Sequence, residues 1–304
     1  MNNDICGRNA LVTGGTDGIG KEVARGLANR GIRVFIAGRD AAKGARAERE
    51  LRDSTGNMTV EFIAADLGLA SEVDSLAGKI AALCPALDYL VHSAGVVLGR
   101  RELNRDGIES NFAINYLARF ALTQRLLPLL ETAGVQGGAS RIVLISGAAQ
   151  NGKIYFDDVN LTANFSTVRA VGQFCQANDV FTVDLARQLQ SASNPPRVTI
   201  TCLKMGVVKT NIRREFPFWM KLLVPLLFDP LLGQTPREAA CAALKLLLDQ
   251  DFEGVTGALF LKIRKFKPLV PSAQVLEPKT GAQLRKLSEL MTADHMSEVS
   301  TKQN

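Results

Sequence analysis

Short, continuously apolar segments alternate with helical segments along this chain, and this alternation constrains its fold most. Seven segments rich in Val, Ile, Leu and Phe are candidate strands: 10–13, 33–37, 59–64, 87–92, 141–146, 198–203 and 257–262. Because they are apolar throughout, they are typical of parallel strands covered by helices on both faces. Helical spacing marks 19–27, 73–83, 108–127, 168–189 and 237–248, and we expect Pro128 to end or kink the third of these. The pattern predicts an α/β fold: a doubly wound (Rossmann) parallel sheet of about seven strands with helices on both faces.

We expect residues 1–304 to form a single Rossmann-type domain, with residues 288–304 as a polar, flexible tail.

One segment does not follow the alternation of strands and helices. Residues 216–233 are almost wholly apolar and contain the only tryptophan, but prolines and charged residues interrupt them, which argues against a membrane-spanning helix. A buried pair of helices, a substrate lid and a flap that touches a membrane peripherally all remain open. We take 211–235 as a lid insertion in which Phe216 and Trp219 contact a small hydrophobic substrate.

Composition excludes several other classes of protein. The net charge of +6 is dispersed among acidic residues, so we expect no nucleic-acid partner. Five cysteines without CxxC spacing indicate reduced thiols, and two histidines exclude a multi-histidine metal site, so we expect no metal. The first residues have no basic-then-apolar leader, which favours a cytoplasmic protein. The oligomeric state is left open.

The strongest motif is a glycine-rich turn, TGGTDGIG, which directly follows a candidate strand and opens an amphipathic helix. That context favours a dinucleotide site, since the glycines permit a tight turn and close approach to a pyrophosphate at the helix start. The residues expected to bind it are Gly14, Thr16, Asp17, Gly18, Ile19 and Gly20.

The second candidate strand ends in Arg39-Asp40, about 20 residues after the turn. An acidic residue there binds a ribose 2′-hydroxyl group, whereas arginine accommodates a 2′-phosphate. Arg39 therefore predicts NADP(H), although a shift of one residue to Asp40 would favour NAD.

Further motifs, in order along residues 8–292, resemble the short-chain dehydrogenase/reductase family and, within it, the retinol-dehydrogenase-like group. The glycine-rich turn resembles TGxxxGIG, HSAG at 92–95 resembles a degraded NNAG, RIVLISG at 141–147 resembles the strand with the catalytic serine, and KMGVVKT at 204–210 resembles the nicotinamide loop. The resemblance implies a Rossmann fold and a nicotinamide cofactor. It adds as cofactor contacts Asp66, Leu67, Ser93, Ala94, Gly95, Asn115, Val208 and Thr210.

The family's acidic pair, a tyrosine and lysine in YxxxK, is absent from the sequence. The resemblance places Val171 at the tyrosine, Cys175 at the lysine and Gly147 at the reactive serine, leaving Asn115 and the neighbouring Ser146 as tentative catalytic residues. A phenol needs a nearby ammonium group to act near neutral pH, and neither Val171 nor Cys175 supplies that chemistry. Tyr155, after the serine strand, is a candidate substitute acid, although an exposed loop position explains it equally simply.

Three functions fit such a site. An NADP-dependent oxidoreductase could transfer hydride to a pre-activated, iminium-like hydrophobic substrate, which needs no proton donor. A non-redox cyclase or isomerase could use the pocket for orientation alone. A non-catalytic nucleotide-binding protein would need neither a hydride acceptor nor an oriented substrate. Consumption of NADPH separates the first from the second, and turnover of any small molecule separates both from the third.

Overall fold

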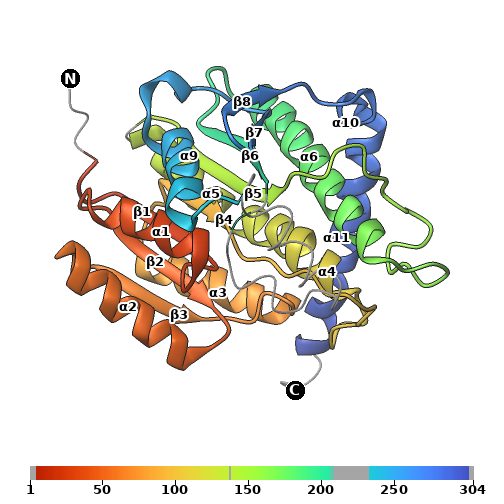
Figure 1. The fold of residues 1–304 in the computed structure, drawn as a ribbon, viewed down its shortest axis with the longest axis horizontal. Coiled ribbons are helices and arrows are strands. Elements are labelled where there is room, and N and C mark those ends of the chain that lie inside the picture. The colour runs from red at the N-terminus through yellow and green to blue at the C-terminus, as the bar shows by residue number, and fades with distance from the viewer. Residues whose placement is uncertain (1–4, 137, 207, 209–232, 301–304) are drawn as a thin grey trace.

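The computed structural model describes residues 5–136, 138–206, 208 and 233–300, and it centres on an eight-stranded sheet (Figure 1). The strand order is β3-β2-β1-β4-β5-β6-β7-β8, with neighbours parallel from β3 to β7 and β8 antiparallel to β7. The strands span Asn9–Thr13 (β1), Arg33–Gly38 (β2), Val60–Ala64 (β3), Tyr89–His92 (β4), Ser140–Gly147 (β5), Val198–Met205 (β6), Ala258–Lys262 (β7) and Phe266–Leu269 (β8). The doubly wound parallel sheet is confirmed.

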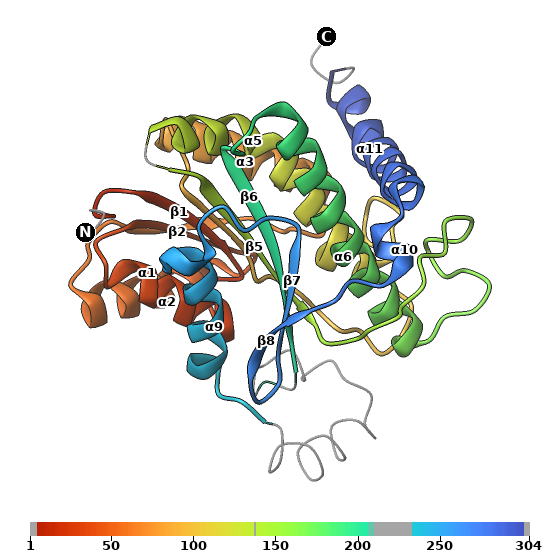
Figure 2. The same ribbon diagram turned by 90° about the horizontal axis from the view of Figure 1, so that it is seen from above.

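Helices cover both faces of the sheet (Figure 2). One face carries α1 (Gly18–Ala28), α2 (Ala41–Thr55) and α9 (Pro236–Leu248). The other carries α3 (Ala70–Leu83), α5 (Ala118–Gln136) and α6 (Thr167–Ala192), with α11 (Pro278–Ser300) packed against all three. Shorter elements are α4 (Ser110–Phe112), a π-helical turn (Ala113–Leu117), a 3-10 turn (Gln250–Phe252) and α10 (Ala273–Leu276).

The two layers explain why the strands are apolar throughout. Along β1, Leu11 faces the core beneath α3, α5 and α6, whereas Ala10 and Val12 face the core beneath α1, α2 and α9. All three side chains are fully buried. Successive side chains of a strand point to opposite faces, so a strand covered twice has no polar side.

The structure adds detail at two elements. The sheet has eight strands where about seven were predicted, because the chain turns back after β7 and adds β8 at the edge, where Pro268 is tolerated. The third helix does not end at Pro128: α5 continues to Gln136. Leu130 and Ala133 are buried beyond the proline. Their burial offsets the one backbone hydrogen bond that proline removes.

The C-terminal segment also differs from the expected flexible tail at 288–304. Residues 288–300 form the second half of α11, and Ser288 and Thr292 are buried. The Ser288 hydroxyl group lies 2.7 Å from the hydroxyl group of Tyr116, which is itself fully buried. Most of the expected lid at 211–235, including Phe216 and Trp219, lies outside the described residues. Among the helices that the structure describes, none is long and apolar enough to cross a membrane.

Candidate active site

A cavity of about 560 Å³ lies at the carboxyl ends of the central strands. It spans the point between β1 and β4 where the strand order reverses, which is where open α/β sheets bind ligands. Predicted site residues that line it are Gly14, Thr16, Asp17, Gly18, Ile19, Arg39, Asp66, Leu67, Ser93, Ala94, Gly95, Asn115, Ser146, Gly147, Val171 and Val208. Gly20, Tyr155 and Cys175 are not among the lining residues, and Thr210 lies outside the described part of the chain.

The glycine-rich turn packs so closely that side chains would collide with its backbone. Gly14 has φ of +68°, and a Cβ atom there would lie 2.8 Å from the Ala94 backbone. A Cβ atom on Gly20 would lie 2.4 Å from the Gly14 carbonyl oxygen. Helix α1 therefore starts directly against the cavity, and Asp17 caps it by accepting from the Gly18 N–H group at 2.8 Å. This cradle fits a dinucleotide pyrophosphate.

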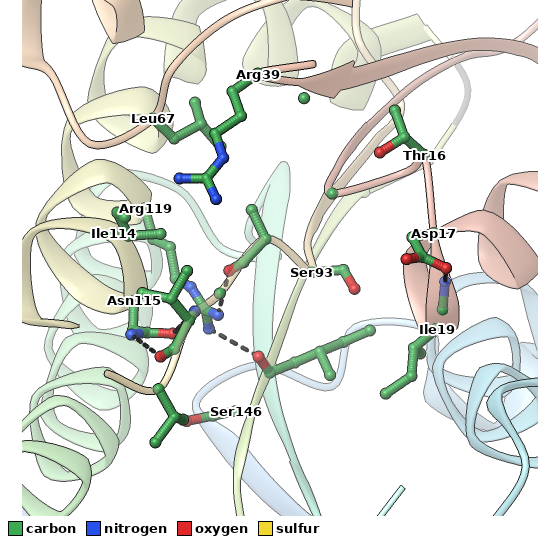
Figure 3. Close-up of a pocket in the computed structure, with 18 of the residues that line it drawn as sticks. Thr16, Asp17, Ile19, Arg39, Leu67, Ser93, Ile114, Asn115, Arg119 and Ser146 are labelled. Carbon is green, nitrogen blue, oxygen red and sulfur yellow. Dashed lines mark hydrogen bonds between the residues drawn. The ribbon is translucent and has the colours of Figure 1, made fainter. Parts of the chain in front are cut away.

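The side chain of Arg39 enters the cavity from the end of β2 (Figure 3). The neighbouring Asp40 has a different role, because it caps helix α2 by accepting from the Lys43 N–H group at 2.9 Å. This backbone hydrogen bond lowers the pKa of the Asp40 carboxyl group. Lys43 also lines the cavity and forms an ion pair with Asp17. This end of the cavity thus presents Arg39 and Lys43, with Lys43 paired to Asp17, while the Asp40 carboxylate caps helix α2.

Asn115 lies in the π-helical turn, a feature common at functional sites. Its side chain is 3% exposed and clamps the loop after β4, donating to the Val96 carbonyl group at 2.8 Å and accepting from the Val96 N–H group at 3.1 Å. The Asn115 carbonyl group accepts from the Asn178 side chain at 3.0 Å. The geometry therefore gives Asn115 a positioning role at the cavity wall.

The wall formed by β5 and α6 is poor in groups that can donate protons. Val171 and Phe174 line it beside Ser146 and Gly147. The Ser146 hydroxyl group contacts the Cys175 sulfur at 3.7 Å, and Cys175 is fully buried. Burial raises the pKa of the Cys175 thiol, so this side chain stays protonated and packs in the core.

None of the three tyrosines, all of which the structure describes, lines the cavity. Tyr89 is buried beside Arg8, and Tyr116 is buried against Ser288. Tyr155 lies in the loop after β5, where its ring centroid is 5.4 Å from the Lys153 ammonium group and 5.3 Å from the Arg169 guanidinium carbon. The structure does not bring Tyr155 to the cavity.

A buried lysine that the sequence did not single out lies behind this wall. Lys204 on β6 is 0% exposed and forms an ion pair with Asp179 on α6. Burial opposes its charge, but the carboxylate of Asp179, together with Cys202 and Cys175, raises the pKa of Lys204. The pair neutralises itself and does not line the cavity.

Arg119 is a second site residue that the sequence did not single out, because arginine is usually exposed to solvent even within an apolar helical segment. It lies at the start of α5, lines the cavity and is only 4% exposed. Its guanidinium group donates to the Ile145 carbonyl group at 2.8 Å and to the Ala94 carbonyl group at 2.9 Å (Figure 3). His92 is buried nearby, 2.9 Å from the Thr123 hydroxyl group. Burial and the charge of Arg119 lower the pKa of His92 well below its usual range, so it is a neutral structural group.

Comparison with known proteins agrees with this geometry. Residues 8–221 match the family described as short chain dehydrogenase. Polyprenol dehydrogenase of Homo sapiens is 34% identical over 263 residues, covering 86% of this chain and 79% of the relative. Retinol dehydrogenase 12 of Mus musculus is 33% identical over 288 residues, covering 94% and 87%. The solved Pseudomonas aeruginosa RhlG/NADP active-site complex has a TM-score of 0.67 and 26% identity, covering 86% of this chain and 97% of that one. The chain therefore belongs to the short-chain dehydrogenase/reductase family and, within it, to the retinol-dehydrogenase-like group.

Proposed function

We propose that this protein is an NADP(H)-dependent oxidoreductase that transfers hydride to a small hydrophobic substrate without a tyrosine–lysine acid pair. The observation that carries the proposal is the contrast between the two ends of one cavity. The glycine cradle, Arg39 and Lys43 suit a 2′-phosphorylated dinucleotide, whereas the opposite wall presents Val171 and Phe174. When bound, NADPH would supply the hydride, and the residues that line the cavity would orient it.

Several chain residues fit the cofactor. The turn before α1 suits the pyrophosphate, and Asp66 and Leu67 line the cavity shortly after the end of β3. Gly95 must remain small, since a Cβ atom there would lie 2.6 Å from the Asn115 amide oxygen. The relatives named retinol and polyprenol dehydrogenases support a hydrophobic substrate class here. A cytoplasmic location remains a prediction.

The missing acid limits the substrates that can react. Hydride transfer to a simple ketone leaves an alkoxide that needs a proton, and no tyrosine lines the cavity to give one. An iminium-like carbon avoids this requirement because the product amine is already neutral. That substrate class is the first candidate.

A second candidate follows from Arg119. Its buried cation disfavours another positive charge close to it and favours a neutral acceptor on which negative charge develops, such as a conjugated carbonyl compound. Solvent would then supply the proton after hydride transfer.

The test is NADPH oxidation by the purified protein against matched hydrophobic rings. Each set contains a cyclic iminium salt, a conjugated ketone and the saturated ketone of the same skeleton, with NADPH deuterated at C4. We expect deuterium in the product of the iminium salt or the conjugated ketone, and turnover of the saturated ketone at least about 100-fold lower. Substrate conversion without NADPH consumption would favour the non-redox cyclase or isomerase. Efficient reduction of the saturated ketone would contradict the proposal.

A further inference from the structure

Arg119 carries a charge that the described protein does not balance. Its Nη atoms donate only to backbone carbonyl groups, and its Nε atom is buried without a hydrogen-bond partner. Within the described ranges, no carboxylate forms an ion pair with it. Lys204, behind the same wall, shows the usual arrangement, since Asp179 neutralises it. Arg119 is thus an uncompensated buried cation that faces the cavity.

The charge persists at neutral pH. Burial lowers the pKa of the Arg119 guanidinium group to about 10, which still leaves the group protonated near pH 7. Its position is fixed by the two carbonyl groups at the ends of β4 and β5, and Figure 3 shows it beside Asn115 and close to Ser146. Arg39 enters from the end of β2, away from this group (Figure 3). The cation therefore belongs to the end of the cavity opposite the 2′-phosphate contacts.

Resting on the proposed function, we infer that Arg119 selects the oxidation state of the bound nucleotide and favours NADPH over NADP⁺. The oxidised nicotinamide ring carries a positive charge and the dihydro ring does not. A fixed cation in a buried environment of low dielectric constant disfavours the charged ring and leaves the neutral one nearly unaffected. The two forms share the same phosphates, ribose and adenine, so their affinity ratio isolates the charge at the ring.

A preference for NADPH determines which form of the nucleotide occupies the site. A site that binds NADPH and rejects NADP⁺ takes up the reductant and releases the oxidised nucleotide after hydride transfer. The same field opposes the positive charge that forms on the ring during hydride transfer, so Arg119 favours loading of the reductant and release of the oxidised nucleotide rather than the transfer step itself. Arg119 is a positioning residue, because it acts through the electric field of its guanidinium group and no proton moves to or from it.

The test compares dissociation constants for NADPH and NADP⁺, measured by calorimetry on the full chain. Arg119→Gln removes the charge and keeps donor atoms, and Arg119→Lys keeps the charge. We expect the unmodified protein to bind NADPH at least about tenfold more tightly than NADP⁺. In Arg119→Gln the ratio should fall by about tenfold, mainly because NADP⁺ binds better, and in Arg119→Lys it should stay within about threefold of the unmodified value.

The outcomes separate this inference from the proposed function. Equal affinity of the unmodified protein for the two forms would overturn the inference while leaving NADP(H) binding intact. An unchanged ratio in a folded Arg119→Gln variant would overturn it too, since a merely structural arginine would weaken both ligands equally. If the variant did not fold, the ratio in the unmodified protein would decide. Binding of neither form would instead contradict the proposed function itself.

Discussion

The two ends of the cavity differ in what they retain. The β1–α1–β2 end fits a phosphorylated nucleotide, because it combines closely packed glycines, the capped start of helix α1 and two cations. At the β5–α6–β6 end, Val171 and Phe174 line the wall, and Lys204 on β6 is paired with Asp179 behind it. The residues proposed to bind the nucleotide and those at the family's proton-transfer positions thus come from different strand–helix units, so one set can change while the other is kept.

The largest expected effect is at the cradle. Gly20→Ala should weaken NADPH binding about 100-fold, because its Cβ atom would lie 2.4 Å from the Gly14 carbonyl oxygen and must displace the turn. Gly78→Ala is the matched control, since Gly78 also lies in a helix but a Cβ atom there meets nothing within 4 Å. Calorimetric titration with NADPH measures both. Equal affinities of the two variants would show that the turn does not shape the site.

Arg39→Met should weaken NADPH binding by about 10–100-fold and leave NADH binding almost unchanged, because a charge-assisted contact to the 2′-phosphate is worth about 1.5–3 kcal/mol. Arg49→Met is the control, since Arg49 is exposed on α2 and lies outside the cavity. Titrations with both nucleotides give the selectivity. If the unmodified protein bound NADH and NADPH equally, Arg39 would have no part in cofactor choice.

His92 ends β4, which lies between β1 and β5 in the sheet, and its burial makes stability depend on pH. Its folded pKa is lowered, so below about pH 6.5 the unfolded chain binds a proton that the folded chain does not. The free energy of unfolding should therefore fall as pH decreases, by up to about 1.4 kcal/mol per pH unit from this group.

The His92→Gln variant isolates this contribution, because other groups titrate alike in both proteins. Urea unfolding at pH 7.5 and 5.5 should show a loss that is smaller in His92→Gln by about 1.4 kcal/mol. Parallel losses in the two proteins would mean that His92 titrates normally in the fold.

The smallest effect is expected for a substitution in the cavity wall formed by β5 and α6. Val171→Ala should change NADPH affinity and the rate of NADPH oxidation by less than about threefold, since Val171 gives no proton and is only partly buried. Val168→Ala, 77% exposed on the same helix, controls for effects on the helix itself. A loss of more than tenfold specific to Val171→Ala would show that its shape places the substrate closely.

Much of this picture could be read from the sequence because its determinants are local. The apolar strands and the glycine-rich turn can each be recognised from a few consecutive residues, and Arg39 directly follows the second strand. Helix α2 was missed because it buries only Gly44, Ala47 and Leu51, too narrow a stripe to show helical spacing. The edge strand β8 was missed because it has only four residues, FKPL, and includes Pro268, a residue that is depleted in strands.

The features missed at the site depend on contacts between distant segments. Arg119 and Lys204 look like ordinary charged residues until the fold buries one beside Ala94 and Ile145 and pairs the other with Asp179. Tyr155 remained a candidate acid in the sequence because only the fold shows its ring beside Lys153 and Arg169. Burial and tertiary pairing, rather than residue type, set these roles.

A pH–rate profile of NADPH oxidation, measured for the unmodified protein and for Tyr155→Phe, tests whether hydride transfer proceeds without a phenol. Phenylalanine keeps the ring beside Lys153 and Arg169 and removes only the hydroxyl group. We predict profiles without a basic limb from a titrating phenol, and rates for the two proteins within about twofold. A basic limb that disappears in Tyr155→Phe, together with a large loss of rate, would show that a displaced tyrosine is the acid and would contradict the account.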